Sequence, residues 1–547
     1  MWRRTYLLLL LIRIYFTLSP SYIHPDEHFQ GPEVFAGRIY SYPSLLTWEF
    51  TSDHPIRSIF PIWLLYGLPM TLLKWLWAEV GNGNPPPRLI YCVLRFTMFL
   101  LSLILEDWAI HELVTNPRRR RQAVVLVASS YVTWTYQTHT FSNSLETLLV
   151  TWSLVLIQWI VENKQRSSIF LCGLLSFVIV LGSFNRITFP AFILIPALHL
   201  VPHFLQKPFS FVSVLLFGII FSFFAVSIDT FFYNPSATYS DLLYKPIITP
   251  LNNVLYNSDS ANLALHGIHP RYQHFLINLP QLLGPAFILL VWSLVVKRGS
   301  ASIFPLRNVR AYAAFFGTAV LSIFPHQEAR FLMPCIPLLL TSFRPPRSRI
   351  FLASWVIFNG LLGILMGVYH QGGVVPTQLH MPTLLSDAIP TAKVPDITKS
   401  ATVLWWKAYS PPLWLFGDAR MNFTVNTRDL KGMPRAEFQH ELDQSVLQCT
   451  PEKTPVDYTD MNSPKIKLLG NLTFLVAPHS NPFLDQFVAQ DSQSTTNLSS
   501  IRLHKLWEYK QHVNMDDFDP GDDGLWGAIQ QVFGRRGLFV WLVTRQC

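Results

Sequence analysis

Long apolar runs with almost no charge are the feature that most constrains what this chain can fold into. Val212–Phe232 and Phe351–Val368 are two such runs, and several others resemble them. Each is about as long as the roughly 20 residues that an α-helix needs to cross the hydrocarbon core of a bilayer. Charged residues make up only 14% of the 547 residues, against about a quarter in a typical soluble domain. The sequence therefore predicts a polytopic membrane protein and disfavours a large soluble protein with buried helices.

Basic residues gather in short segments between the apolar runs, and they indicate the side on which each loop lies. These segments are Arg3–Arg4, Arg118–Arg121, Lys164–Arg166, Lys297–Arg298 and Arg344–Arg349. Because loops rich in Lys and Arg stay in the cytosol, we expect these segments on that side. The net charge of +9, from 42 basic and 33 acidic residues, then reflects membrane topology and not a nucleic-acid-binding patch.

Twelve segments are candidate spans, and their number conflicts with the charge pattern. They are residues 4–20, 58–78, 89–106, 122–137, 144–161, 167–184, 187–203, 209–233, 275–296, 311–325, 331–343 and 350–369. Twelve crossings from a cytosolic N-terminus would return the C-terminus to the cytosol, whereas the basic loops place it outside. We therefore expect about 11 spans, with the incomplete crossing in residues 58–106. The predicted fold class is an all-α polytopic membrane bundle with lumenal interfacial helices and a small lumenal α+β region near the C-terminus.

The last third of the chain differs in composition from the rest. Residues 1–370 form the predicted membrane region, with outer loops at 21–57 and 234–274, and residues 371–547 form a C-terminal region on the same outer side. Within the C-terminal region, LLGNLTFLVAP predicts a β-strand and residues 491–500 a flexible loop.

Glycosylation sequons and cysteines in the C-terminal region bear on its location. This region holds the three N-x-S/T sequons, at Asn422, Asn471 and Asn497, which agrees with a lumenal position. Cys449 and Cys547 also lie there. In an oxidising lumen they either form a disulfide or remain two free thiols.

The segment IHPDEHFQGPE, residues 23–33, places ionisable groups directly after the first apolar run. Helical spacing puts Asp26, Gln30 and Glu33 on one face of a short interfacial helix. Glu33 and, less well, Glu27 also fit a solvated helix start, where acids merely complement the helix dipole. Charge so close to a bilayer is costly unless it is used, and this favours a functional role for the cluster.

Two further polar segments interrupt the apolar runs. THTFSNSLETLL begins at Thr138, and there Ser142 or Asn143 is most simply explained as the N-cap of the following helix. FNRITFP carries Arg186 at the end of a span. Its guanidinium either extends to the interface along the membrane surface or contacts a phosphate, and the first explanation is favoured.

The last two polar segments are rich in groups that bind sugars and phosphates. The loop Thr249–Pro285 holds many Asn, His, Tyr and Arg residues, which either bind a hydroxyl-rich ligand or pack among themselves. In FPHQEARFLMP, Arg330 presents a planar donor fork suited to phosphate. Glu328 either orients this arginine or simply pairs with it, and both can hold together.

The charge pattern places all of these polar segments on one side of the membrane. Carboxylates, amides, aromatic rings and arginines on one face form a site for an anionic, sugar-like or lipid-phosphate ligand. The sequence contains no phosphate-binding loop, no CxxC and no HExxH motif, so a nucleotide-driven pump or a zinc hydrolase has no support. No DxD motif occurs in these segments, and we predict no metal site and no cofactor.

Several of these motifs together resemble one enzyme family. HPDEHFQGPEV, TWEF (Thr47–Phe50), THTFSNSLET, LNNVLYN, NLALHGIHPRYQH, HQEARF and WWKAYSPPLWLFG (Trp405–Gly417) are similar to the dolichyl-phosphate-mannose-dependent mannosyltransferases of glycosyltransferase family 22. The similarity runs from about residue 20 to about 417. It implies a GT-C fold in the endoplasmic reticulum membrane, and it is strongest for members that extend the GPI-anchor precursor.

The resemblance also implies a reaction. Dolichyl-phosphate-mannose donates mannose, with inversion, to the third mannose of the GPI precursor glycolipid in an α-1,2 linkage. Enzymes that add the third mannose itself are the alternative, but Phe50 and Gln327 depart from their TWEW and lysine-containing HKE patterns. A lipid transporter or scramblase is the alternative from another functional class. Such a protein is expected to carry ionisable residues near the middle of its spans, and often to consist of two related halves. A non-catalytic subunit of a glycosylation complex is a further alternative, and the motifs argue against it.

The resemblance assigns roles to individual residues. Asp26 is expected to be the general base, with Glu27 as the alternative base or as a partner that orients base or acceptor. Arg330 and His326 are expected to hold the donor phosphate. Second candidates for the phosphate are His269, Arg271 and His274, and the weakest assignments are acceptor contacts from Trp48 and Asn253.

Overall fold

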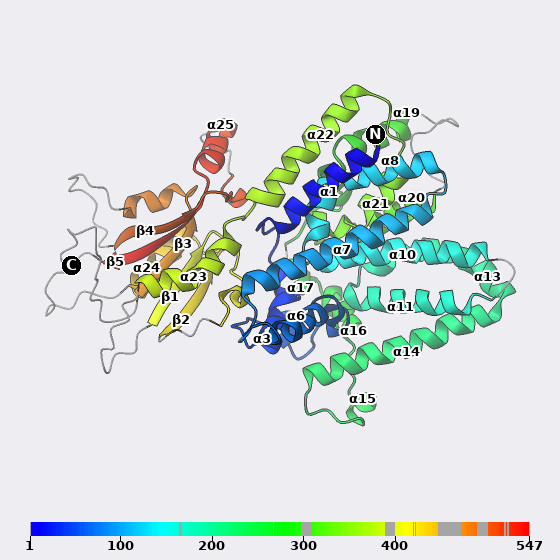
Figure 1. The fold of residues 1–547 in the computed structure, drawn as a ribbon, viewed down its shortest axis with the longest axis horizontal. Helices are drawn as coiled ribbons and strands as arrows, with labels where there is room; N and C mark the ends of the chain where they lie inside the picture. Colours follow the sequence, from blue (N-terminus) through cyan, green and yellow to red (C-terminus); the bar gives the residue numbers. More distant parts are fainter. Residues whose placement is uncertain are drawn as a thin grey trace.

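The computed structural model describes residues 2–81, 83–163, 167–265, 267–296, 308–388, 400–418, 421, 423–446, 472–488, 501–518, 521 and 524–545. These residues form a large bundle of α-helices and, beside it, a β-sheet with helices packed on it (Figure 1). Several sequence predictions fall outside the described residues: the sequons at Asn422, Asn471 and Asn497, the cysteines Cys449 and Cys547, and the loop 491–500.

Six helical stretches among the described residues are long and apolar enough to cross a membrane. They are Ile59–Ala78 (α5 to α6), Pro87–Leu113 (α7), Ser142–Glu162 (α10), Phe189–Gln206 (α12 to α13), Pro208–Tyr233 (α14) and Arg349–Tyr369 (α22 and the turn after it). Two apolar helices are shorter, Ile169–Asn185 (α11) and Val309–Leu321 (α20). In Figure 1, α7, α10, α11 and α14 lie roughly parallel across the bundle. The predicted multi-span membrane protein is therefore confirmed.

Other candidate spans are broken into shorter helices. The segment predicted at 275–296 forms a π-helical turn, His274–Asn278, then α18, Leu279–Leu283, and α19, Pro285–Val296. The break falls at Gly284, where φ is +50° and a Cβ would lie 2.5 Å from the Phe358 ring. Only glycine fits such a position easily. Because broken helices make crossings ambiguous, the count of about 11 spans stays a prediction.

The chain between the first helix, α1 (Trp2–Leu18), and α5 (Ile59–Ile62) forms three short helices. They are α2, Asp26–Phe29, α3, Pro32–Tyr40, and α4, Trp48–Thr51. The predicted single interfacial helix is thus two helices that divide at Gly31. A Cβ on Gly31 would lie 2.3 Å from the Tyr66 ring, so glycine lets the chain pass close to this ring.

The C-terminal part contains a five-stranded mixed sheet in the order β2-β1-β3-β5-β4. The strands are β1, Ser400–Trp406, β2, Thr424–Leu430, β3, Leu472–Pro478, β4, Ile501–Tyr509, and β5, Leu538–Arg545. β1 pairs in parallel with β2 and β3, and β5 pairs antiparallel with β3 and β4. The strand predicted from LLGNLTFLVAP is confirmed as β3.

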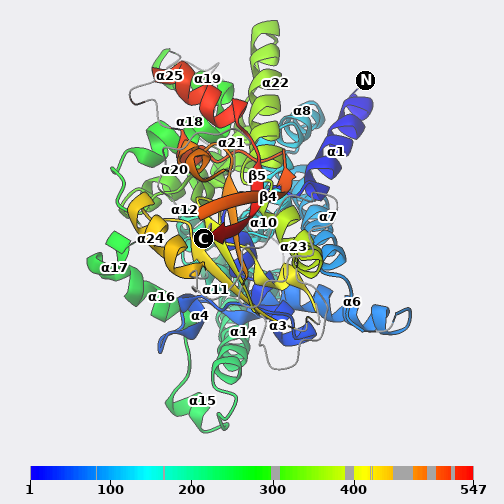
Figure 2. The same cartoon turned by 90° about the vertical axis from the view of Figure 1, so that its left-hand side faces the viewer.

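One helix covers each face of this sheet (Figure 2). On one face, Met381 and Leu385 of α23 (Val374–Ala388) join the core formed by side chains such as Trp405. On the other face, Phe438 of α24 (Arg435–Ser445) stacks on Trp406, with ring centroids 4.0 Å apart. Successive strand residues point to opposite faces, which is why adjacent tryptophans join two separate cores.

The segment after β1 links the sheet to the helical bundle. Trp414 is fully buried and packs in a cluster with residues of α3, α6 and α7. Ser410 accepts a hydrogen bond of 3.1 Å from the Tyr22 hydroxyl, and the Tyr409 ring lies 6.5 Å from that of His24. The WWKAYSPPLWLFG motif therefore packs against one side of the segment that carries Asp26.

Candidate active site

Asp26 lies at the start of α2 in a cluster of charged side chains. Its carboxylate pairs with the guanidinium of Arg330, which also pairs with Glu328. The Gln30 Nε2 donates to Asp26 Oδ2 at 2.6 Å, as helical spacing predicts. His24 lies 3.3 Å from Asp26 and 3.8 Å from Glu328. The Asp26 side chain keeps 22% of its surface exposed, so a substrate can approach it.

The charges of this cluster determine its protonation. Burial raises the pKa of Asp26, but Arg330 and His24 lower it more, and the net pKa lies well below its usual range. Glu328 behaves in the same way, with burial opposed by Arg330, and its pKa is also lowered. Both carboxylates are therefore ionised at neutral pH. A single guanidinium, that of Arg330, bridges them.

Glu27, directly beside Asp26, has a different environment. It is fully buried. Its Oε1 accepts from the Ile23 backbone N–H at 2.8 Å, and its Oε2 contacts Arg95 at 3.4 Å and also His139. Arg95 in turn donates to the carbonyl of Phe16, at 3.3 Å, near the end of α1. Glu27 therefore fixes the segment that carries Asp26, and the explanation of Glu27 as a solvated helix start is wrong.

Burial raises the pKa of Glu27 to about 8, although the Arg95 charge opposes this shift. Above that pH, where Glu27 is ionised, we expect Glu27→Gln to destabilise the protein by about 3 kcal/mol, because an amide cannot accept all of these donors and leaves the Arg95 charge without a carboxylate. Thermal unfolding in detergent measures the effect, and the folded Glu27→Gln variant should remain catalytically active. A variant with unchanged thermal stability and no activity would instead place Glu27 in the chemistry.

Glu33 is also buried, and it does not share the face of Asp26 as predicted. Its Oε1 accepts from the Leu45 backbone N–H at 3.0 Å, because the turn at Gly31 directs α3 away from α2. The solvated explanation of Glu33 is therefore wrong. Burial raises the pKa of Glu33 to about 8, against 4.5 for the free side chain.

This raised pKa makes stability depend on pH. Between the two values the folded protein keeps a proton that the unfolded chain releases, so the contribution of Glu33 to stability falls as pH rises through this window. We expect Glu33→Gln to flatten the fall in melting temperature between about pH 5 and pH 8. The exposed Glu437→Gln is the control and should leave the profile unchanged; equal slopes for wild type and Glu33→Gln would contradict the assignment.

Arg186 lies inside the site and not along the membrane surface, so the favoured interfacial explanation is wrong. Its Nε lies 3.1 Å from Glu146, and a terminal nitrogen donates to the Ser142 hydroxyl at 3.0 Å. The side chain is only 9% exposed. Its guanidinium and that of Arg330 lie 5.1 and 5.4 Å from the same Phe331 ring. Arg186 is thus a second cation close to Arg330. Its position at the end of a predicted span did not indicate this contact.

The expected helix-cap role of Ser142 or Asn143 is also wrong. α10 begins at Ser142, and its N-cap residue, Phe141, makes no side-chain cap. Ser142 instead accepts from Arg186 through its hydroxyl and from Asn185 through its carbonyl, at 2.8 Å. The THTFSNSLET motif therefore joins two span ends at the site.

The other residues predicted to bind the donor phosphate, three histidines and Arg271, divide into two groups. His326 lies 3.3 Å from Glu328, and the His269 ring lies 5.9 Å from the His326 ring. Both therefore lie beside the Arg330 cluster. His274 is fully buried and shares a hydrogen bond of 2.9 Å with Asn278, while Arg271 is exposed at the surface. Their phosphate roles stay predictions, and the geometry favours His326 and His269.

The residues predicted for the acceptor lie at the rim of the site. The Trp48 ring lies 4.7 Å from that of Tyr256 in α16 (Thr249–Ser258). Asn253, also in α16, donates to the carbonyl of Ile56 at 3.3 Å. Glu49, next to Trp48, lies 3.4 Å from Gln30, which contacts Asp26. These contacts connect the rim to Asp26, and the acceptor role stays a prediction.

The site contains ionised carboxylates and two guanidinium groups, which lie on short segments between the apolar helices. Within the described ranges, no group of three or more His, Cys, Asp or Glu side chains is arranged to hold a metal ion. A carboxylate can accept a proton and a guanidinium can hold a phosphate, so this arrangement can catalyse transfer from a phosphate-activated donor. Fold and site define a multi-span membrane enzyme of the transferase type.

Comparison with known proteins assigns the family. The chain belongs to the Alg9-like mannosyltransferase family, whose sequence model matches residues 4–417. It is therefore a glycosyltransferase.

Similar proteins cover almost the whole length of the chain. It is 56% identical to a protein of Aspergillus oryzae called GPI mannosyltransferase 4, over 100% of this chain and 99% of that protein. Proteins of the same name from Yarrowia lipolytica and Saccharomyces cerevisiae are 37% and 33% identical, each over 93% of this chain and 95% of the relative. Among solved structures, ArnT from Cupriavidus metallidurans bound to undecaprenyl phosphate matches with a TM-score of 0.40 and 12% identity, over 71% of this chain and 67% of that one.

Proposed function

We propose that this protein transfers mannose from dolichyl-phosphate-mannose to the third mannose of the GPI-anchor precursor, forming an α-1,2 linkage. The proposal places a GT-C type bundle in the endoplasmic reticulum membrane with its site on the lumenal side. The proposed chemistry rests on the contact between Asp26 and Arg330, because this contact joins a proton acceptor to a group suited to bind phosphate. The relatives called GPI mannosyltransferase 4 support the choice of acceptor.

The reaction is a single displacement at the anomeric carbon. The acceptor hydroxyl attacks this carbon and gives its proton to Asp26. The bond between the carbon and the phosphate oxygen breaks, and its electron pair stays on the departing dolichyl phosphate. Arg330 stabilises that charge, with Arg186 and His326 beside it. Attack from the opposite side converts the β-linked donor into an α-linked product.

Donor binding would also change the basicity of Asp26. Without donor, the Arg330 guanidinium is shared between Asp26 and Glu328, which makes Asp26 a weak base. A donor phosphate on Arg330 competes for its N–H groups and adds negative charge, so it raises the pKa of Asp26. Asp26 would then become an effective base only when the donor is in place. This favours an order of events in which the donor binds before the proton is transferred.

The test is a reconstituted reaction. Purified full-length protein receives dolichyl-phosphate-mannose and, in parallel reactions, GPI lipids that carry two or three mannoses, and mass spectrometry identifies the products. A Man4-GPI product from the Man3-GPI lipid supports the proposal. A product from the two-mannose lipid alone would mean that the protein adds the third mannose. No product from either lipid in the presence of folded protein would overturn the proposal.

A further inference from the structure

The helix α16, at the rim of the candidate active site, is amphipathic in the opposite sense to a surface helix of a soluble protein. Its apolar side chains Leu251, Val254 and Leu255 point outward and are 49, 44 and 63% exposed. A surface helix in water buries its apolar stripe and exposes its polar side chains. The outward face of α16 therefore fits an apolar environment and not water.

The polar side chains of α16 face the protein and hold the helix in this orientation. Asn252 donates to the carbonyl of Pro55 at 3.0 Å, and Asn253 donates to that of Ile56 at 3.3 Å. Turning the apolar face inward would break both hydrogen bonds and leave two backbone carbonyls without these donors. The exposed apolar face is therefore a fixed feature of the fold.

Ser258, the polar residue on the outward face, also fits an apolar environment. Its hydroxyl donates to the carbonyl of Val254, one helical turn earlier, at 2.7 Å. Ser227 of α14 makes the same bond to Phe223 at 2.7 Å, on a helix that is long and apolar enough to cross a membrane. In hydrocarbon a hydroxyl must find its acceptor within the protein, and this bond supplies one.

The outward face of α16 continues the surface of the membrane helix α14. Asp229, near the end of α14, accepts from the Thr249 hydroxyl at 2.8 Å, at the first residue of α16. Thr230 accepts from the Ile247 backbone N–H at 3.0 Å. These bonds fix the start of α16 to the end of α14. The apolar face of α16 is therefore continuous with a helix whose own exposed side chains meet lipid.

The connection between α14 and α16 carries exposed aromatic side chains. Tyr239 and Tyr244 are 83 and 84% exposed, and Lys245 follows directly. They lie in or beside α15 (Asp241–Tyr244), which projects from the edge of the helical bundle in Figures 1 and 2. Tyrosine rings and a lysine are typical of the boundary between membrane and water. Together with the apolar face of α16, they form the pattern of a segment that lies in this boundary.

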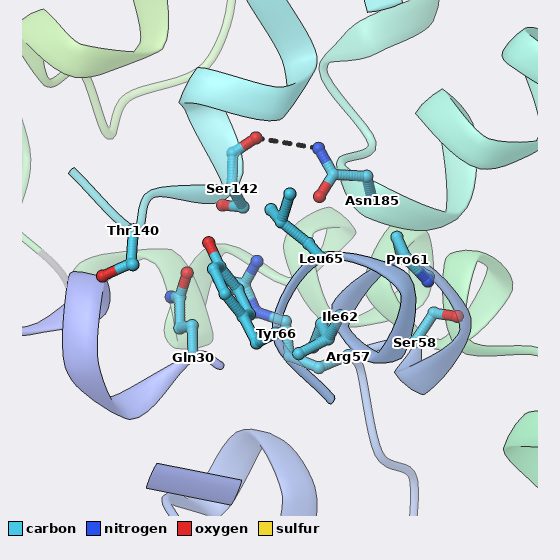
Figure 3. Close-up of a pocket in the computed structure, with 10 residues that line it drawn as sticks. All are labelled: Gln30, Arg57, Ser58, Pro61, Ile62, Leu65, Tyr66, Thr140, Ser142 and Asn185. Carbon is cyan, nitrogen blue, oxygen red and sulfur yellow. Dashed lines mark hydrogen bonds between the residues drawn. The ribbon is translucent and has the colours of Figure 1, made fainter. Parts of the chain in front are cut away.

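The loop that α16 covers leads into the candidate active site. Arg57 and Ser58 follow directly after Ile56, and they line a small cavity together with Gln30 (Figure 3). Gln30 in turn donates to Asp26 at 2.6 Å. The contacts of α16 therefore connect its lipid-like outer surface to the cluster around Asp26.

We propose that the outward face of α16 lies among the acyl chains of the leaflet on the active-site side, and that it forms a lipid-facing entrance to the site. A substrate with a hydrocarbon tail then keeps this tail in the leaflet while its sugar reaches Asp26. The position of α16 is independent of the reaction, whereas its use as an entrance rests on the proposed function, because that function has lipid-linked substrates.

Photolabelling tests the position of α16. A photoreactive diazirine analogue of leucine replaces Leu255 in full-length protein in phosphatidylcholine vesicles, and mass spectrometry identifies the adducts formed on illumination. The analogue at Ile219, exposed on α14, is the control for lipid contact, and at Glu437, exposed on α24, the control for water. We expect position 255 to give phospholipid adducts in about the yield of position 219 and roughly tenfold above position 437.

Two outcomes of the photolabelling would overturn the proposal. Phospholipid adducts at position 255 no more frequent than at position 437 would mean that α16 faces water. Adducts from position 255 to protein in place of lipid would mean that another chain, or another part of this one, covers the helix.

Leu255→Ser tests the entrance. We expect kcat/KM for dolichyl-phosphate-mannose in vesicles to fall about 3- to 10-fold, because an apolar contact with lipid is lost. A short-chain, water-soluble mannosyl phosphate donor should be used as well as by wild type. The control Leu506→Ser, at an exposed leucine of β4, should change neither value.

An unchanged kcat/KM for the long-chain donor, or an equal loss with both donors, would overturn the role of α16 as an entrance. If wild type makes no Man4-GPI, the proposed function fails, and the photolabelling still decides where α16 lies.

Discussion

Asp26→Asn should reduce the rate of mannose transfer by roughly 10³-fold, because an amide cannot accept the proton of the attacking hydroxyl. Asparagine has nearly the same shape, and it can still accept from Gln30, which donates to Asp26 in the structure. The variant should therefore fold and bind donor. The measurement is kcat in a detergent or vesicle assay with labelled dolichyl-phosphate-mannose, normalised to the amount of folded protein.

The control for this variant is Asp485→Asn. Asp485 also pairs with an arginine, Arg535, at 2.6 and 2.8 Å, but on the surface of the sheet part. Its removal should leave kcat unchanged. Full activity of Asp26→Asn would show that Asp26 is not the base. Glu27 would then require a rearrangement to serve, because its carboxylate is fully buried among protein donors.

Arg330→Lys should raise the apparent KM for dolichyl-phosphate-mannose about tenfold or more, with a much smaller effect on the KM for the acceptor. The guanidinium contacts Asp26 and Glu328 through different nitrogens, and a single ammonium cannot bridge two carboxylates and a phosphate in that geometry. Steady-state kinetics with each substrate varied in turn measures this difference.

Arg38→Lys is the matched control for this second prediction. Arg38 lies over the Phe232 ring, with 3.5 Å between the guanidinium carbon and the ring centroid, outside the Arg330 cluster. Its replacement should change neither KM. An unchanged donor KM for Arg330→Lys would remove the phosphate role and leave Arg330 as a purely structural partner of Asp26.

Long uniform helices were predicted well from hydropathy alone. The spans expected at 209–233 and 350–369 correspond to helices at Pro208–Tyr233 and Arg349–Tyr369, because an apolar run of that length has few alternatives to a membrane helix. Hydropathy failed where the chain bends inside an apolar run. The break at Gly284 depends on the position of Phe358, which lies far away in sequence.

The site was predicted less completely. HPDEH and HQEARF were both expected on one side of the membrane, and Asp26 and Arg330 pair there, although 304 positions separate them in the sequence. The partners of Glu27 were missed, since Arg95 lies within an apolar helix and His139 in a segment explained as a helix cap.

The sequence by itself determined that this chain crosses a membrane and which polar segments lie together on one side, since hydropathy and loop charge are local properties. Only the tertiary structure separated Asp26 from Glu27. These neighbours point in different directions from one helical turn, so that one faces an open cluster and the other a buried arginine. Burial and charge partners depend on helices that pack from distant parts of the chain, and these contacts determine which carboxylate can meet a substrate.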